Sequence, residues 1–502
     1  MTLLVGVTVA YLALLPRNLG PADESVHLYD AKRLLGGAVM YRDVFNDITP
    51  GWMYLMALLF GLFGTTIGVA RIGMAVIHGL TAGVVYATCR SLNVSRGWSW
   101  PPALAYLVIC QSAWPIASQH WLSTFLGAVA LWLCALHLRD RGRWSFALGI
   151  VLGLFVGVQQ QRAAMMVAGV VVWLVLNAAL DRRYAVRSLR ALFGTLAWAA
   201  AGGALVVVPL LSWVIAQAGF ARVWRALVIF PLYDYAGVTH CPWGDVNIMT
   251  AWQASFTFPT FLKYLPVAML PPAARLASAL ARGGARQEAA RLLLLLVTAA
   301  TSIASISYFP DFIHIAFIAP VFLIMIAESA EWAVGWVAGS AADRRSRPYR
   351  IASVVAGAVL LAAAAGRLYD NRVRLYRDFP ASRASAFGRV DMKEQDALLF
   401  DRVRELLAAT PSRYLYCYPI IAHLYLMLDV ENPTAHGFFS PGYSGPDLVQ
   451  EVVDSLDATR PPYIVFLSMW RRPDDRVADW IAEHYEPIGE TPQDTLIYRP
   501  KT

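Results

Sequence analysis

The stretch PRNLGPADESVHLYDAKRLLGGAVMYRDVFNDITP, residues 16–50, decides the fold. It follows an apolar N-terminal segment and gathers a histidine and five carboxylates in one short polar loop: Asp23, Glu24, His27, Asp30, Asp43 and Asp47. The chain around it has a mean hydropathy of +0.49. A carboxylate cluster held next to apolar segments indicates chemistry at a membrane surface.

Composition sets the broad class. The chain has 502 residues, of which 58% are hydrophobic and 15% charged, and apolar runs recur over residues 1–366. This composition predicts a polytopic α-helical membrane protein. The net charge of +8 comes from Lys and Arg in short loops between apolar runs, which orient membrane helices, so no nucleic-acid partner is expected. The five cysteines show no metal-binding spacing.

The apolar runs predict eleven transmembrane helices, several of them near the lower length limit of about 20 residues. They are 1–15, 67–89, 101–117, 121–138, 145–161, 164–181, 191–217, 259–278, 291–308, 312–338 and 350–366. The apolar segment Gly51–Gly64 is too short to span a bilayer and is expected to be interfacial or re-entrant. With that assignment the Arg clusters share the cytoplasmic side, as the positive-inside rule requires. The acidic loop, the turns at 159–162 and 308–314, and everything after residue 366 are then outside.

The chain is expected to consist of a transmembrane domain, 1–366, with a first outer loop at 16–64, and an extracytoplasmic domain, 367–502. In the second part helical patterns alternate with short apolar strands, which predicts a small α/β domain. The predicted strands are Arg413–Pro419, Pro462–Ser468 and Thr495–Pro500, and the predicted helices are Lys393–Ala409, Asp447–Thr459 and Asp474–Glu483. This part contains no nucleotide-binding or nucleophile-elbow motif.

Asp23 and Glu24 precede a predicted helix, Ser25–Leu35, which would place His27 and Asp30 one turn apart. A carboxylate at this depth can act as a general base. The alternative is an acidic N-cap on an interfacial helix. The loop by itself leaves both interpretations open.

A series of short motifs carries a resemblance to a known family. They are Asp23-Glu24, the LLGG of 34–37, the YRD of 41–43, Pro50-Gly51, the LFG of 62–64 and Ala70-Arg71, followed by FPDFIH at 309–314. The chain resembles the GT-C superfamily of polyprenyl-phosphate-sugar-dependent glycosyltransferases, and is most similar to its protein O-mannosyltransferase and lipid A aminoarabinose transferase branch. Thr49 stands where many relatives have Pro, and Phe309 stands where many bacterial members have Arg.

The resemblance implies transfer of a sugar from a polyprenyl-phosphate donor to a glycan, lipid or protein acceptor. The transfer would take place at the outer face of the cytoplasmic (inner) membrane, with inversion at C1. It implies Asp23 as the base and Glu24 as the second carboxylate, with Asp43 and Asp47 as sugar contacts or ligands of a divalent metal. The wider substrate-binding set that we expect is His27, Tyr41, Arg42, Asp43, Asp47, His120, Arg162, Asp311 and His314.

Arg162 is the leading candidate to bind the departing phosphate, because an Arg on the outer side has little topological purpose. Its alternative role is snorkelling to lipid headgroups. His120, Asp311 and His314 lie at outer span ends and could equally be packing residues. The rival function is a lipid-linked saccharide flippase or secondary transporter, which usually shows repeated halves and charges deep in several spans. Neither sign is clear in this sequence.

Overall fold

The structure, a computed structural model, describes most of the chain. The described residues are 16–20, 23–140, 142–180, 185–235, 241–244, 260–282, 286–337, 347–410, 412–439, 442, 444–468, 471–491 and 495–501. The predicted first span, 1–15, lies outside them.

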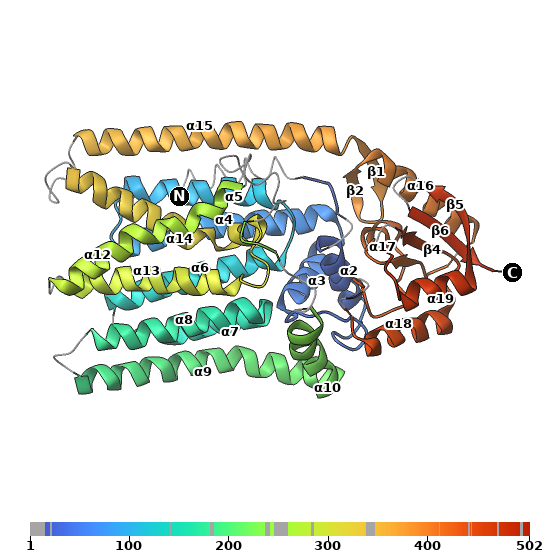
Figure 1. The fold of residues 1–502 in the computed structure, drawn as a ribbon, viewed down its shortest axis with the longest axis horizontal. Coiled ribbons are helices and arrows are strands. Elements are labelled where there is room, and N and C mark those ends of the chain that lie inside the picture. The colour runs from blue at the N-terminus through green and yellow to red at the C-terminus, as the bar shows by residue number, and fades with distance from the viewer. Residues whose placement is uncertain are drawn as a thin grey trace.

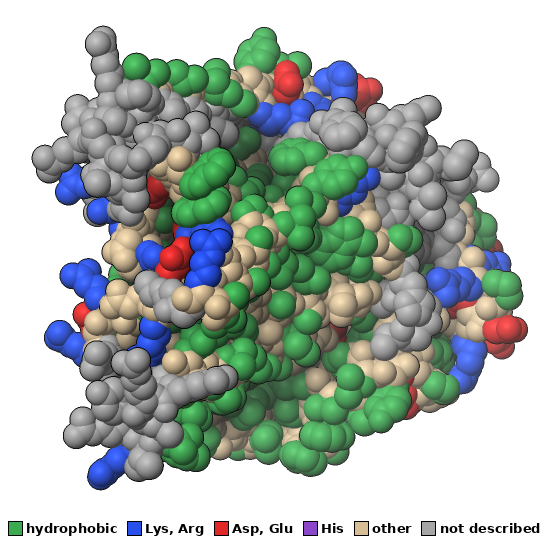
Figure 2. Space-filling view, turned by 60° about the vertical axis from the view of Figure 1, so that its left-hand side comes forward, with side chains coloured by type: hydrophobic (Ala, Val, Ile, Leu, Met, Phe, Trp, Pro, Cys, Tyr) green, Lys and Arg blue, Asp and Glu red, His purple; other side chains and the backbone are tan. Residues whose placement is uncertain are grey.

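A bundle of long helices carries the smaller C-terminal domain at one end (Figure 1). Six described helices are long and apolar enough to cross a membrane. They are α4 (Ile67–Ser91), α6 (Gln119–Asp140), α8 (Gln160–Ala179), α9 (Ala185–Ala218), α13 (Arg286–Ser305) and α14 (Phe312–Val337). Figure 2 shows the broad hydrophobic surface of the bundle, with several Lys and Arg side chains along its left edge. Such a surface fits a multi-pass membrane protein.

The predicted count of eleven spans is not confirmed. Helix α5 (Arg96–Ala113) contains two prolines, and α7 (Ser145–Val158) has only 14 residues. The predicted span 259–278 is divided into a 3-10 helix, η3 (Thr260–Met269), and α12 (Leu270–Ala281). Hydropathy alone misses these divisions, because it does not register where proline interrupts the backbone hydrogen bonds of a helix.

The segment 16–64, predicted as the first outer loop, lies at the end of the bundle that faces the C-terminal domain (Figure 1). It forms α2 (Glu24–Leu35), in agreement with the predicted helix, and α3 (Gly51–Phe63). At 1.5 Å per residue the 13 residues of α3 reach about 20 Å, which is less than the hydrocarbon thickness of about 30 Å. At the same end as α3, the segment after α9 forms α10 (Phe220–Trp224) and a π-helix, η2 (Arg225–Tyr235), whose Phe230 meets Phe45 at 5.2 Å (Figure 1).

The C-terminal domain follows α15 (Arg347–Asp378), which continues as one helix past the predicted boundary at residue 366. The helix continues because residues 367–378 contain neither Gly nor Pro. The domain contains a hairpin, β1 (Ala381–Ser385) and β2 (Gly388–Met392), and a mixed sheet in the order β3-β4-β6-β5. Strands β3 (Tyr416–Tyr418), β4 (Ile464–Leu467) and β6 (Thr495–Pro500) are those predicted, whereas β5 (Tyr485–Thr491) is not. The helices are α16 (Glu394–Ala409), α17 (His423–Leu428), α18 (Pro446–Thr459) and α19 (Arg476–His484).

The C-terminal domain contacts the first outer loop through its segment 429–439. The Asn432 backbone N–H donates to the Tyr29 hydroxyl at 2.7 Å, and the Phe45 N–H donates to the Ala435 carbonyl at 2.9 Å. The Arg33 guanidinium donates to the Thr434 carbonyl at 3.0 Å. These three hydrogen bonds fix the position of the acidic loop between the bundle and the sheet domain.

Candidate active site

Five segments that are far apart in the sequence meet at this end of the bundle. They are the turn before α2, the loop 36–50, the first turns of α6 and α8, and the connection from α13 to α14. The Gln160 side chain donates to the Asp47 carbonyl at 2.8 Å, and the His120 and His314 rings meet at 5.3 Å. The acidic loop and the turns near 159–162 and 308–314, which were all predicted to be outer, therefore share one end.

Asp23 stands at the start of α2 with its side chain accessible to solvent, yet protein surrounds it on most sides. Desolvation in this concave position raises the pKa of its carboxyl group; His314 lowers it and Asp311 raises it. The side chain makes no capping hydrogen bond to α2. The N-cap alternative therefore does not describe what this carboxylate does.

Asp47 is the second carboxylate of the group. Burial raises its pKa to about 6, and the charge of Asp23 adds to that rise. Gln160 fixes the loop around it, because its Nε2 donates to the Asp47 carbonyl and its Oε1 accepts the Thr49 N–H at 3.1 Å. Two neighbouring carboxylates with raised pKa values are typical of a catalytic site.

The Glu24 carboxylate is engaged by an arginine of the helix bundle. This carboxylate forms a two-pronged ion pair with Arg71 of α4, and both side chains are almost completely buried. It also accepts the Ala117 N–H at 2.6 Å, while Arg71 donates to the carbonyls of Pro16 and Asn18. Both Glu24 oxygens are engaged. The pair joins the chain entering α2 to α4 and to the turn before α6.

Arg162 lies in the first turn of α8, not in a loop, because the only break between α7 and α8 is at Gln159. It is 6% exposed, and its guanidinium donates only to neutral oxygens: the carbonyls of His120 and Phe317, both at 3.1 Å, and the hydroxyls of Ser123 and Thr124. Among the residues that the structure describes, no carboxylate pairs with Arg162, and its Nε–H has no partner. A buried cation without a counter-ion is costly unless an anion binds.

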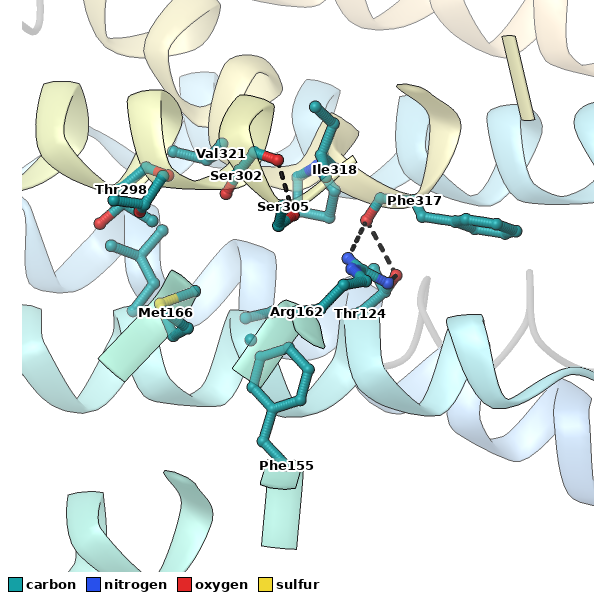
Figure 3. Close-up of a pocket in the computed structure, with 15 residues that line it drawn as sticks. Thr124, Phe155, Arg162, Met166, Thr298, Ser302, Ser305, Phe317, Ile318 and Val321 are labelled. Carbon is teal, nitrogen blue, oxygen red and sulfur yellow. Dashed lines mark hydrogen bonds between the residues drawn. The ribbon is translucent and has the colours of Figure 1, made fainter. Parts of the chain in front are cut away.

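A small cavity of about 40 Å³ lies beside Arg162, between α6, α8, α13 and α14 (Figure 3). Hydroxyl groups of Thr124, Ser302 and Ser305 line it together with Phe155 and Met166. A cavity of this size, mainly apolar with a few hydroxyl groups, has room for about one or two waters. Arg162 therefore has access to polar groups on both of its sides.

His314 lies within electrostatic reach of Asp23, and His120 contacts both Arg162 and His314. The His120 ring stacks on Phe317 at 4.6 Å, and its Nδ1 lies 3.0 Å from the Gln159 amide nitrogen. The His314 Nδ1 lies 2.7 Å from Asp311, whose carboxylate also accepts the His314 backbone N–H. Asp311 thus caps α14 and fixes the orientation of the His314 ring.

His27 and Asp30 lie one turn apart on α2, as predicted, and both contact the Asn46 amide nitrogen, at 3.2 and 2.9 Å. Burial lowers the pKa of His27 to about 4 and raises that of Asp30 to about 7. This network lies between α2 and the loop 36–50. It gives His27 a fixed orientation next to His120.

The other predicted residues of the loop, Tyr41, Arg42 and Asp43, make contacts within the loop itself. Arg42 is exposed and pairs with Asp43, which also accepts the Val39 N–H, and the Tyr41 hydroxyl donates to the Ile48 carbonyl. These contacts shape the turn. Asp43 and Asp47 do not come together as ligands: within the described ranges no three His, Cys, Asp or Glu side chains form a group suited to a metal ion.

Sequence reasoning missed Asn46, Gln159, Gln160 and Tyr308 as site residues. Tyr308 lies within the electrostatic reach of Arg162, Asp47 and Asp311, and burial raises its pKa to about 12. The available signal was the run Gln159–Arg162, four polar residues between two apolar helices. Glutamines have no role in membrane orientation, so such a run indicates a site.

The fold was compared with those of known proteins. No protein-family model and no curated protein matches the sequence. Among solved structures, ArnT from Cupriavidus metallidurans bound to undecaprenyl phosphate is similar over 99% of this chain and 97% of its own, with a TM-score of 0.61 and 14% identity. An Archaeoglobus fulgidus oligosaccharyltransferase tethered to an acceptor peptide is similar over 99% and 74%, with a TM-score of 0.56 and 12% identity. The mycobacterial arabinofuranosyltransferase AftD is similar over 99% and 41%, with a TM-score of 0.51 and 15% identity. These three proteins are GT-C glycosyltransferases, and the chain has the GT-C fold that its sequence motifs predict.

Proposed function

We propose that this protein is a membrane glycosyltransferase that moves a sugar from a polyprenyl-phosphate donor to an acceptor at the outer face of the cytoplasmic membrane. The observation that carries the proposal is the arrangement at one end of the bundle. A solvent-facing carboxylate, Asp23, shares a histidine-lined site with Arg162, a buried cation that has no carboxylate partner among the described residues. The names of the similar structures, one bound to undecaprenyl phosphate, support the same donor class.

In this mechanism Asp23 accepts the proton of the acceptor hydroxyl or amine as that atom attacks C1 of the sugar. The bond from C1 to the phosphate oxygen breaks, its electron pair stays on the lipid phosphate, and the configuration at C1 inverts. Arg162 stabilises the charge that develops on the phosphate, because a guanidinium offers two parallel N–H donors to it. Asp47 is assigned as the second carboxylate and sugar-hydroxyl acceptor, in place of Glu24.

Two residues position these groups. Gln159 holds His120 against Phe317, and Asp311 orients His314 beside Asp23. The segment 429–439 lies over the acidic loop, which supports a role for the C-terminal domain in limiting access to the site.

The test uses the purified protein in lipid nanodiscs with a panel of undecaprenyl-phosphate sugars and measures the release of undecaprenyl phosphate. The Arg162→Ala variant should lose most of its affinity for the sugar-donor lipid. The Arg162→Lys variant should keep part of that affinity, because Lys retains the charge but cannot form two parallel hydrogen bonds to one phosphate. Unchanged donor dependence in Arg162→Ala would rule out its phosphate role. A flippase would move the lipid without cleaving it, so intact donor on the opposite leaflet would favour the rival function.

A further inference from the structure

A second cavity lies at the opposite end of the helix bundle from the candidate active site. It has a volume of about 1010 Å³ and opens between the last turns of α4, α6 and α8, the starts of α7 and α13, and the N-terminal part of α9. Its polar walls include four arginines: Arg90, Arg139, Arg286 and Arg291. The mechanism proposed above uses none of them.

Two of these arginines converge on one turn. Arg291 of α13 donates to the Leu92 carbonyl at 2.8 Å, and Arg90 of α4 donates to the Val94 carbonyl. Within the described part of the chain, no carboxylate lies within ion-pair distance of either one. A guanidinium carries five N–H donors, so each retains donors for a ligand. Arg139 approaches only Asp140, at 3.9 Å, and is 75% exposed at the mouth.

The inner walls of this cavity are both polar and apolar. Ser145 and Thr195 are buried there, and the buried Nδ1 of His137 has no hydrogen-bond partner among the described residues. Leucine and tryptophan side chains complete the lining: Leu138, Leu174, Leu192 and Trp198. A cationic mouth above an apolar wall matches an amphiphile whose polar end is an anion.

We propose that this cavity binds an anionic phospholipid, with the phosphate on Arg90 and Arg291 and the acyl chains along the apolar wall. Arginine forks fit phosphate oxygens, and basic pockets between transmembrane helices recognise such headgroups. The volume exceeds what a free phosphate ion needs and lies at the upper end of the range for small-molecule sites. The inference is independent of the proposed glycosyl transfer.

The test is native mass spectrometry of the full-length protein titrated with phosphatidylglycerol, phosphatidylcholine or inorganic phosphate. Wild type should retain phosphatidylglycerol, and the double variant Arg90→Gln/Arg291→Gln should bind it at least about 10-fold more weakly, because two charge-assisted contacts are lost. Arg377→Gln is the matched control, since that exposed arginine of α15 pairs with Asp378 outside the cavity. It should bind as wild type does.

Arg90 and Arg291 also hold the turn at 92–94, so a second variant keeps the charges and fills the space. A Cβ atom at Gly194 meets no heavy atom within 4 Å, so Gly194→Trp should fold and exclude the lipid. Equal retention of phosphatidylcholine, or lipid binding that neither variant reduces, would overturn the proposal. Displacement of the lipid by millimolar inorganic phosphate would identify a soluble anion as the ligand and would also overturn it.

Discussion

Two buried arginines at the same end of the bundle should respond to the same substitution in opposite ways. Arg71 is 2% exposed and paired with Glu24, whereas Arg162 is 6% exposed and bonded only to neutral oxygens. Methionine has a similar length and no charge. Arg71→Met and Arg162→Met therefore form a matched pair of perturbations.

The expected changes in stability and in phosphate affinity follow from the groups that each substitution leaves without a partner. Without Arg71, the Glu24 carboxylate stays buried with the Ala117 N–H as its remaining donor among the described residues, and breaking a buried ion pair in this way costs about 3–5 kcal/mol. Without Arg162, four hydrogen bonds to neutral acceptors are lost, but the desolvation cost of an unpaired cation, several kcal/mol, is also removed. The free energy of unfolding should then change little. A ligand phosphate, however, would lose two charge-assisted hydrogen bonds of about 1.5 kcal/mol each, or about 100-fold in affinity.

The assay is thermal unfolding of both variants in detergent, with and without undecaprenyl phosphate. Arg71→Met should lower the unfolding midpoint markedly, and the lipid should still raise it. Arg162→Met should unfold near the wild-type midpoint and show no rise with the lipid. The reasoning is refuted if Arg162→Met is the less stable variant, because Arg162 would then be a structural residue and not a ligand site.

Three further predictions concern the acidic loop and the topology. Asp23→Asn should reduce turnover by about 10²–10⁴-fold with an unchanged unfolding midpoint, and normal turnover would remove Asp23 from the mechanism. The pKa of Asp30 is about 7 in the folded state against 3.8 unfolded, so the folded state binds more protons between these values and stability falls as pH rises through this window. Between pH 5 and pH 8 this fall should be about 2.6 kcal/mol, and Asp30→Asn should abolish it in unfolding measured at the two pH values. A pH dependence equal to that of wild type would contradict the assignment. A cysteine at Ser444 should react with an impermeant reagent outside intact spheroplasts and one at Gln287 should not, and the reverse pattern would invert the topology.

The sequence by itself determined that the chain is a multi-pass helical membrane protein and predicted its fold and most of its helices, because apolar runs and helical periodicity are local properties of the chain. It also predicted that the acidic loop, Arg162 and His314 share one end of the bundle, because loop charges report orientation. The strands at 416–418, 464–467 and 495–500 were predicted for the same local reason, whereas β5 was not, because its pairing with β6 depends on a distant segment.

Only the tertiary structure decided what each charged side chain does. Glu24 and Asp47 look alike in the sequence, but Arg71 of α4 engages Glu24, while the fold leaves Asp47 beside Asp23. Likewise Arg162 and Arg71 are both arginines near helix starts, and only packing shows which one has a carboxylate partner. The physical reason is that ion pairing and desolvation depend on distances between residues that are 24 or more positions apart in the sequence, and hydropathy and local spacing contain no information about those distances.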